Sequence, residues 1–262
     1  MKSPLSEALW PARAVMLNPV EPSKGATRTA VFYLVRRALF PFFYSSWRMG
    51  SPMPNAGSMG AAKGTVMKPL ITKDTPVTDE VLNTIAHLPT RSLSKIVDDG
   101  FFKKLADRDF MRIAFLLAKK GYEEGGSPIG GVIISNETRQ IVGKGHNTLV
   151  QENHPYNHGE TSAVRDAGRQ DFSQTTMFTS LSPCDICAAL IYMRQFKRLV
   201  VGDVTNSSGN EPILRQKGVQ VDILEDPEGV SFYAKYRKEK PNQDLEDWQG
   251  LAAVRKAAAG RS

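Results

Sequence analysis

The only two cysteines of the chain, Cys184 and Cys187, lie three positions apart in the stretch PCDIC. A histidine and a glutamate, His158 and Glu160, stand earlier in the stretch HGE, with His158 placed 26 residues before Cys184. If one metal ion is held by the histidine and both cysteines, these two stretches must meet in space. That demand restricts the possible folds more than any other feature of the sequence.

A Cys-x-x-Cys pair serves as a redox dithiol, as half of a structural zinc site or as part of a catalytic zinc site. A four-cysteine site is excluded, because the chain has two cysteines. A redox pair stays open on position alone, since a predicted strand precedes it. The order H-x-E, then P-C-x-x-C, is however the known signature of zinc-dependent deaminases. We therefore predict one zinc ion per chain, held by His158, Cys184 and Cys187, with the fourth position left for water.

Glu160 is expected to move protons and not to bind the metal. A carboxylate beside an activated water can take up a proton and deliver it to a ring nitrogen and then to a leaving amine. Both ligand stretches begin predicted helices, and a helix N-terminus favours the thiolate form of Cys184 and Cys187. Pro183 suits the turn that enters the second helix.

Strands and helices alternate from residue 107 onward. Asp107 begins a helix with Phe110, Ile113 and Leu117 on one face. Two short strands within GSPIGGVIIS and QIVGKGHN follow, joined by the polar turn NETR. The pattern then predicts helix 158–168, strand 175–181, helix 184–194, strand 198–204, a short helix near 211–217, strand 219–224 and one or two C-terminal helices. This order indicates an α/β domain with the sheet between helix layers.

The N-terminal quarter differs in composition. Residues 1–68 hold nine Lys or Arg and two acidic residues, a net charge of +7, which equals that of the whole chain. We expect this basic, low-complexity extension to be disordered or outside the fold. A mitochondrial targeting peptide and a membrane-surface or partner-binding segment are the alternatives. The apolar run 30–47 is too short to span a membrane, and Arg36 and Arg37 interrupt it.

The remaining chain is expected to divide into a helical lead-in, residues 69–106, and a zinc-dependent catalytic domain, residues 107–259. No secretory signal pattern opens the chain, and two cysteines make no disulfide framework. We therefore expect a cytoplasmic protein without a membrane span.

From about residue 107 to 249 the chain resembles the fungal-type cytosine deaminases of the cytidine deaminase superfamily. The matching stretches are GYEEGGSPIGGVII, GKGHN, HGETSAV, TTMFTSLSPCDICAALIYM, RLVVGD and LEDWQG. The resemblance implies a three-layer α/β/α sandwich with a mixed five-stranded sheet. It also implies the zinc ligands His158, Cys184 and Cys187, proton transfer by Glu160, and a homodimer in pyrimidine salvage with the zinc-site helices near its interface.

The resemblance further implies contacts to the substrate. Asn147 matches an asparagine that hydrogen-bonds the pyrimidine, and the backbone N–H of Gly159 would approach the base carbonyl, where a side chain would crowd it. Asp247 matches an acid that contacts the amino group and ring edge. Glycine at position 159, where nucleoside and tRNA deaminases typically have alanine, favours a free base. Trp248 would either cap the pocket or pack in a core.

One loop departs from the resemblance. Ser207 stands near the place where the fungal enzymes have an aromatic residue, so a larger pocket would accept guanine or another aminated heterocycle. The leading hypothesis is a zinc-dependent deaminase that converts free cytosine to uracil and ammonia. The alternatives are a guanine or nucleoside deaminase, and a tRNA or nucleic-acid deaminase that uses the basic extension. Nucleic acid is disfavoured as a partner, because the chain from residue 69 onward carries no net charge.

Overall fold

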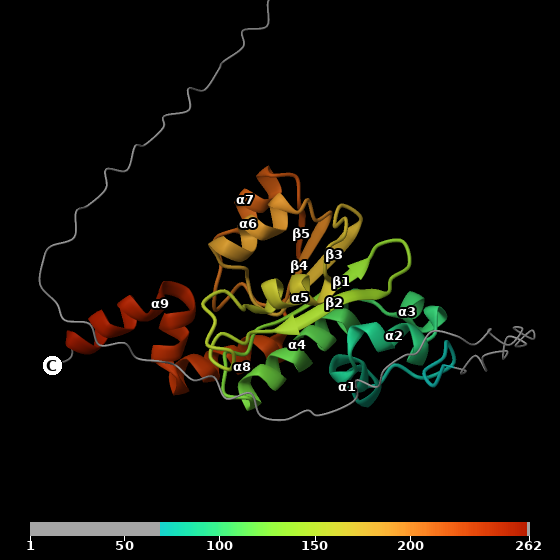
Figure 1. The fold of residues 1–262 in the computed structure, drawn as a ribbon, viewed down its shortest axis with the longest axis horizontal. Helices are drawn as coiled ribbons and strands as arrows, with labels where there is room; N and C mark the ends of the chain where they lie inside the picture. The colour runs from blue at the N-terminus through green and yellow to red at the C-terminus, as the bar shows by residue number, and fades with distance from the viewer. Residues whose placement is uncertain (1–68, 261–262) are drawn as a thin grey trace, which may run out of the picture. The chain divides into compact units, whose positions relative to one another are not determined.

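The computed structural model of this chain describes residues 69–260. The expectations stated for residues 1–68 lie outside the described residues. Between residues 69 and 260, helices flank both faces of one sheet (Figure 1). In this part of the chain no helix combines the length and the hydropathy needed to cross a membrane.

The sheet has five strands in the order β2-β1-β3-β4-β5. Strand β1 runs antiparallel to both β2 and β3, whereas β3, β4 and β5 are parallel to one another. The predicted mixed five-stranded sheet is therefore confirmed. The strands are β1 (Gly130–Ser135), β2 (Ile141–His146), β3 (Thr175–Thr179), β4 (Arg198–Val201) and β5 (Gln220–Ile223).

Strands β3 and β4 end two and three residues earlier than the sequence pattern predicts, at Thr179 and Val201. The chain segments that follow them turn toward each other. They are joined by a hydrogen bond from the backbone N–H of Ser182 to the carbonyl of Asp203, at 2.8 Å. Apolar residues therefore continue past the ladder, because the chain stays buried after it leaves the sheet.

One face of the sheet is covered by α4 (Asp107–Glu123) and, beside it, α8 (Pro227–Glu239). The ring of Phe232 on α8 meets Phe115 and Tyr122 of α4, with ring centroids 5.7 and 5.1 Å apart. The sheet side chains that face this layer are Val132, Ile134, Phe178 and Val200.

The other face is covered by α5 (Gly159–Ala167), α6 (Asp185–Met193) and α7 (Glu211–Gln216). The sheet contributes Ile133, Met177, Leu199, Val201 and Val221 to this second core. Alternate residues of each strand thus enter opposite cores, as the period of two in a strand requires. The two cores make the three-layer α/β/α sandwich (Figure 1).

The lead-in consists of α1 (Asp79–His87), α2 (Thr90–Ile96) and α3 (Asp99–Lys104). Phe101 and Phe102 are 0% and 1% exposed and belong to the same buried cluster as Phe110 of α4. The ammonium of Lys144 on β2 donates to the carbonyls of Ala86 and Leu88, at 2.7 and 2.6 Å. The lead-in therefore packs on the first core and on the edge strand of the sheet.

The chain ends in α9 (Pro241–Ala259), which is interrupted at Gly250. This residue has φ of 77° and ψ of 174°, a backbone conformation that residues other than glycine rarely adopt. The kink separates the last turns of α9 from the stretch that carries Asp247 and Trp248.

Candidate metal centre

The three predicted ligands lie at the starts of two helices on the same side of the sheet. His158 is the N-cap of α5 and Cys184 is the N-cap of α6, and both have extended backbone angles. Cys187 follows in the first turn of α6 and is fully buried. Helix N-termini carry partial positive charge, which favours thiolates over thiols at this place.

The donor atoms fit a zinc ion. The ring atom Nδ1 of His158 lies 3.3 Å from Sγ of Cys184 and 3.6 Å from Sγ of Cys187. All three donor atoms are within 4.8 Å of one another. Zn–S bonds of about 2.3 Å and Zn–N bonds of about 2.0–2.1 Å in a tetrahedron place nitrogen and sulfur about 3.6 Å apart. One imidazole and two thiols thus stand close to the separations that zinc requires, and the predicted zinc cofactor is confirmed.

The thiol of Cys184 is more acidic than an ordinary cysteine thiol. Hydrogen bonds from the Cys187 thiol and from the ring of His158 lower the pKa of Cys184 to about 4, although its burial opposes the change. Cys184 is therefore a thiolate at neutral pH, and a thiolate is the form that binds metal.

Glu160 lies beside the ligands and is 2% exposed. Its carboxylate accepts a hydrogen bond from the hydroxyl of Thr179, at 3.1 Å. Burial, and after it the charge on Cys184, raise the pKa of Glu160. A carboxyl group beside the metal ligands can take up a proton from a neighbouring water and release it again.

Asn147 and Asp247 meet although 100 residues separate them. Nδ2 of Asn147 donates to Oδ1 of Asp247 at 2.7 Å, and Oδ1 of Asn147 accepts from the backbone N–H of Leu149 at 3.0 Å. The Asp247 side chain is 3% exposed, and its Oδ1 lies 3.8 Å from Nε2 of His158. Burial raises the pKa of Asp247 to about 6, against the opposing effects of His158 and Asn147.

Gly159 packs directly against the start of β1. A Cβ atom at this position would lie 2.9 Å from the carbonyl oxygen of Ile129 and 3.1 Å from Cα of Gly130. The backbone of Ile129 and Gly130 therefore leaves no room for a side chain at residue 159. Since α5 approaches the sheet this closely, His158 and Glu160 are held at a fixed depth.

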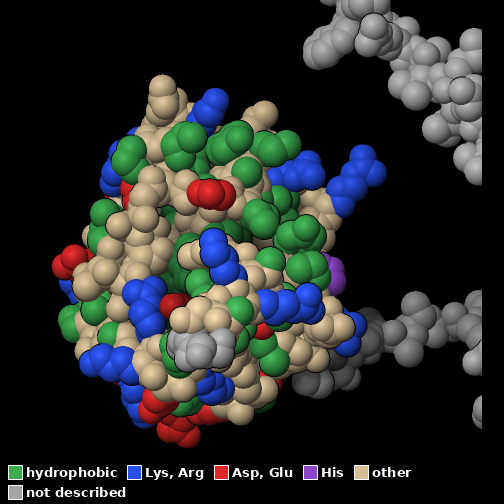
Figure 2. Space-filling view, turned by 90° about the vertical axis from the view of Figure 1, so that its left-hand side faces the viewer, with side chains coloured by type: hydrophobic (Ala, Val, Ile, Leu, Met, Phe, Trp, Pro, Cys, Tyr) green, Lys and Arg blue, Asp and Glu red, His purple; other side chains and the backbone are tan. Residues whose placement is uncertain are grey.

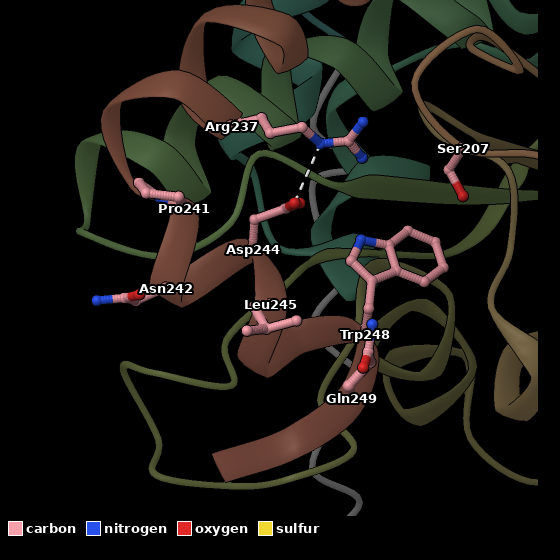
Figure 3. A pocket seen from close by; sticks show the side chains of 8 residues that line it. All are labelled: Ser207, Arg237, Pro241, Asn242, Asp244, Leu245, Trp248 and Gln249. Carbon is pink, nitrogen blue, oxygen red and sulfur yellow. Dashed lines mark hydrogen bonds and ion pairs between the residues drawn. The ribbon is translucent and has the colours of Figure 1, made fainter. Parts of the chain in front are cut away.

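Trp248 has two sets of neighbours. Its Nε1 donates to the hydroxyl of Tyr233 at 3.2 Å, and its ring packs against the cluster that contains Tyr233 and Tyr236. It also lines the cleft that reaches His158 and Cys184. A second hollow of about 430 Å³ is lined by Trp248, Ser207 and Arg237 among others. Figure 3 shows the side chains that line it. Trp248 thus both packs in the structure and forms a wall of the cleft.

The cleft above the ligands has a volume of about 750 Å³. This size lies within the range that encloses whole small molecules. Four of the predicted residues border it: His158, Cys184, Asp247 and Trp248. One part of the cleft wall is a stretch without aromatic side chains, which comprises Ser207, Ser208, Gly209 and Asn210.

Several residues of the site were not predicted from the sequence. Thr179 contacts Glu160, and Tyr156 borders the cleft with more than half of its surface exposed. Asn210 and Glu211 contact the turn that precedes the cysteines. No short-range pattern marks these residues, because each acts through a partner distant in sequence. The predicted helix near 211–217 was the one available signal for the position of Glu211.

Comparisons with known proteins show what this chain is similar to. Residues 105–203 match the family described as the cytidine and deoxycytidylate deaminase zinc-binding region. The chain is 42% identical over 144 residues to a cytosine deaminase of Candida albicans. This alignment covers 54% of this chain and 95% of that protein. The chain is 32% identical over 118 residues to a tRNA-specific adenosine deaminase of Buchnera aphidicola, covering 44% and 77%. A solved guanine deaminase from Nitrosomonas europaea aligns with a TM-score of 0.47 at 16% identity, covering 51% and 85%.

Proposed function

Because this chain belongs to the cytidine and deoxycytidylate deaminase family of zinc-dependent hydrolytic deaminases, we propose that its substrate is a free nucleobase, with cytosine converted to uracil and ammonia. One observation carries the choice of substrate. Asn147 and Asp247 present a buried amide and a buried carboxylate side by side, next to His158. A pyrimidine with an amino group next to a ring nitrogen and a carbonyl offers partners for both.

The chemistry divides between the metal and the chain. Zinc, when held by His158, Cys184 and Cys187, lowers the pKa of a water to about 7 and so supplies a nucleophile at neutral pH. Glu160 takes up the proton that this water gives off and passes it to a ring nitrogen of the base. The oxygen of the same water would form a bond to the ring carbon that bears the amino group. Glu160 would then take the remaining proton of that oxygen and deliver it to the amino nitrogen, so that the carbon–nitrogen bond breaks, ammonia leaves and the base keeps a carbonyl group.

Binding of the base requires a local exchange of hydrogen bonds. In this structure Nδ2 of Asn147 donates to Oδ1 of Asp247. A base that enters would accept from Asn147 with its carbonyl oxygen and donate to Asp247 with its amino group. A ligand without both groups would leave a buried polar atom unpaired, which is a strong source of discrimination.

The substrate is tested by ammonia release from cytosine, cytidine, guanine, adenine and tRNA, measured side by side on the zinc-loaded full chain. We expect kcat/KM for cytosine to exceed that for cytidine by at least the roughly 10²-fold that one steric mismatch produces. Asp247→Ala should lose this activity while zinc content stays at about one per chain. Asp171→Ala removes a carboxylate from an exposed loop and serves as the control. A clear preference for cytidine, guanine or tRNA would contradict the cytosine proposal.

A second candidate substrate is guanine, and one feature of the cleft favours it. The stretch Ser207 to Asn210, which lines the cleft, has no aromatic side chain, and Ser207 stands near the place where the similar fungal-type enzymes have one. A purine needs more room than a pyrimidine. The guanine arm of the ammonia assay decides between the two bases.

The tRNA or nucleic-acid alternative has less support in the described part of the chain. Figure 2 shows the face at the α9 end of the molecule, where Lys and Arg side chains are scattered among hydrophobic and other side chains. A nucleic-acid surface is expected to gather its basic residues in one stripe or patch. This face therefore gives no support to a nucleic-acid substrate.

We further propose that the enzyme is a homodimer that works in the cytoplasm in pyrimidine salvage. Helix α6, which begins at the zinc site, exposes apolar side chains to solvent: Ile186 is 47% and Met193 is 68% exposed. A second copy of the chain would cover this face. A reducing compartment would also keep Cys184 and Cys187 available as metal ligands.

Light scattering at micromolar concentration is expected to give twice the 28.9 kDa mass of one chain. The double variant Ile186→Arg with Met193→Arg should lower this mass to that of a monomer, because two charges would lose water at the interface. Leu70→Arg changes a 77% exposed apolar residue on the lead-in and should leave the dimer intact. A wild-type mass of 28.9 kDa would contradict the dimer.

A further inference from the structure

A buried carboxylate contacts the turn Ser182–Asp185, which carries the ligand Cys184 and is called the cysteine turn below. The proposed chemistry does not use this carboxylate. Glu211, the first residue of α7, is 5% exposed. Its Oε1 accepts from the hydroxyl of Ser182 at 2.5 Å, and its Oε2 accepts from the backbone N–H of Gly209 at 2.9 Å. Ser182 is itself 2% exposed and stands two residues before the ligand Cys184.

The neighbouring residue makes a second connection to the same turn. Nδ2 of Asn210 donates to the carbonyl of Pro183 at 2.9 Å and to the carboxylate of Asp185 at 3.1 Å. These two acceptors are the residues on either side of Cys184. Nδ2 of Asn210 thus holds the backbone before the ligand and the side chain after it.

The segment that makes these connections also forms the wall of the cleft. Its first half is anchored by Asp203, which accepts from the backbone N–H groups of Thr205 and Asn206 at 2.8 and 3.0 Å. Asn206 also donates to the carbonyl of Val230 on α8, at 2.9 Å. The second half of this segment, Ser207 to Asn210, borders the cleft and is followed directly by Glu211. The wall is therefore fixed to α8 at one end and to the cysteine turn at the other.

We infer that Asn210 and Glu211 are positioning residues that set Cys184 for zinc and couple the metal to the substrate wall. A buried carboxylate without hydrogen bonds is costly, and Glu211 is satisfied when Ser182 and Gly209 are both in place. Zinc fixes the cysteine turn and so favours the ordered wall, and the ordered wall favours zinc by the same free energy. The inference rests on the zinc site of the proposed function and not on the identity of the base.

The test measures zinc affinity by competition with a chelator on the full chain. Groups that hold metal ligands in place typically change affinity 10–100-fold when they are removed, and we expect Glu211→Ala to weaken zinc binding by about this factor. Asn210→Ala should weaken it by about tenfold, the low end of that range. Glu211→Gln keeps one acceptor oxygen and should restore part of the loss. Glu80→Gln alters an exposed glutamate in the first turn of α1 and should leave affinity unchanged.

A second measurement reads the coupling directly. In the wild type, zinc should slow hydrogen exchange at the amide of Gly209 and its neighbours, and in Glu211→Ala this slowing should be lost. Wild-type zinc affinity in Glu211→Ala would overturn the inference. So would hydrogen exchange around Gly209 that zinc slows as much in Glu211→Ala as in the wild type. If Glu211→Ala does not fold, the half-buried Asn210→Ala decides by the same two readings. If the wild type binds zinc but does not deaminate cytosine, the substrate proposal fails and these measurements still decide the inference.

Discussion

Replacement of Glu160 by glutamine is expected to lower kcat for deamination by about 10²–10⁴-fold, the range for a positioned proton transfer. Glutamine keeps the shape of the side chain and an oxygen that accepts from Thr179, so the structure around it should persist. What it loses is the ability to take up and release a proton at neutral pH. Zinc should stay at about one per chain, because the three donor atoms belong to other residues.

The measurement is ammonia release at saturating substrate, paired with metal analysis of the same preparation. Glu137→Gln serves as a matched control, since Glu137 is exposed in the turn between β1 and β2. It should leave both kcat and zinc content unchanged. Near-normal turnover by Glu160→Gln would mean that another group carries the proton.

The second large effect concerns the metal. The double variant Cys184→Ala with Cys187→Ala should bind no zinc and should have no measurable deaminase activity. It leaves His158 as the one remaining donor of the cluster, and a single imidazole cannot hold zinc in competition with buffer. The expected zinc content falls from about one per chain to none.

His87→Ala is the control for this loss, because it removes an exposed histidine outside the cluster. Metal analysis should find wild-type zinc in that variant. Retention of zinc by the double cysteine variant would show that the ligands have been assigned wrongly. Added zinc should restore activity to chelator-treated wild type and not to the double variant.

The sequence predicted the parts of this structure that depend on neighbours within a few residues. Apolar periodicity located α4, and the polar turn NETR located the hairpin of β1 and β2. The metal ligands were also predictable, because zinc chemistry admits few donor types and the chain has two cysteines and four histidines. These patterns are local, or they concern residue types too rare to leave many choices.

Long-range contacts were out of reach of such patterns. Periodicity does not say that β1 lies between β2 and β3, since it reports which side of a strand is apolar and not which strand is next to it. The meeting of Asn147 with Asp247 was implied by resemblance, and only their hydrogen bond at 2.7 Å fixes it. The predicted helix near 211–217 placed Glu211 at a helix start but did not mark it as a site residue, because a glutamate there is ordinary until its burial is known.

The packing of the lead-in also determines where this protein can be cut. The family match begins at residue 105, which suggests a catalytic unit that starts there. Yet Phe101 and Phe102 fill the same core as Phe110 and Ile113. Proteolysis after Lys104, followed by release of α1 to α3, would bare that apolar surface to water, and surfaces of this kind drive self-association. Loss of α1 to α3 would therefore favour aggregation, and the protein would lose its activity even with every zinc ligand intact.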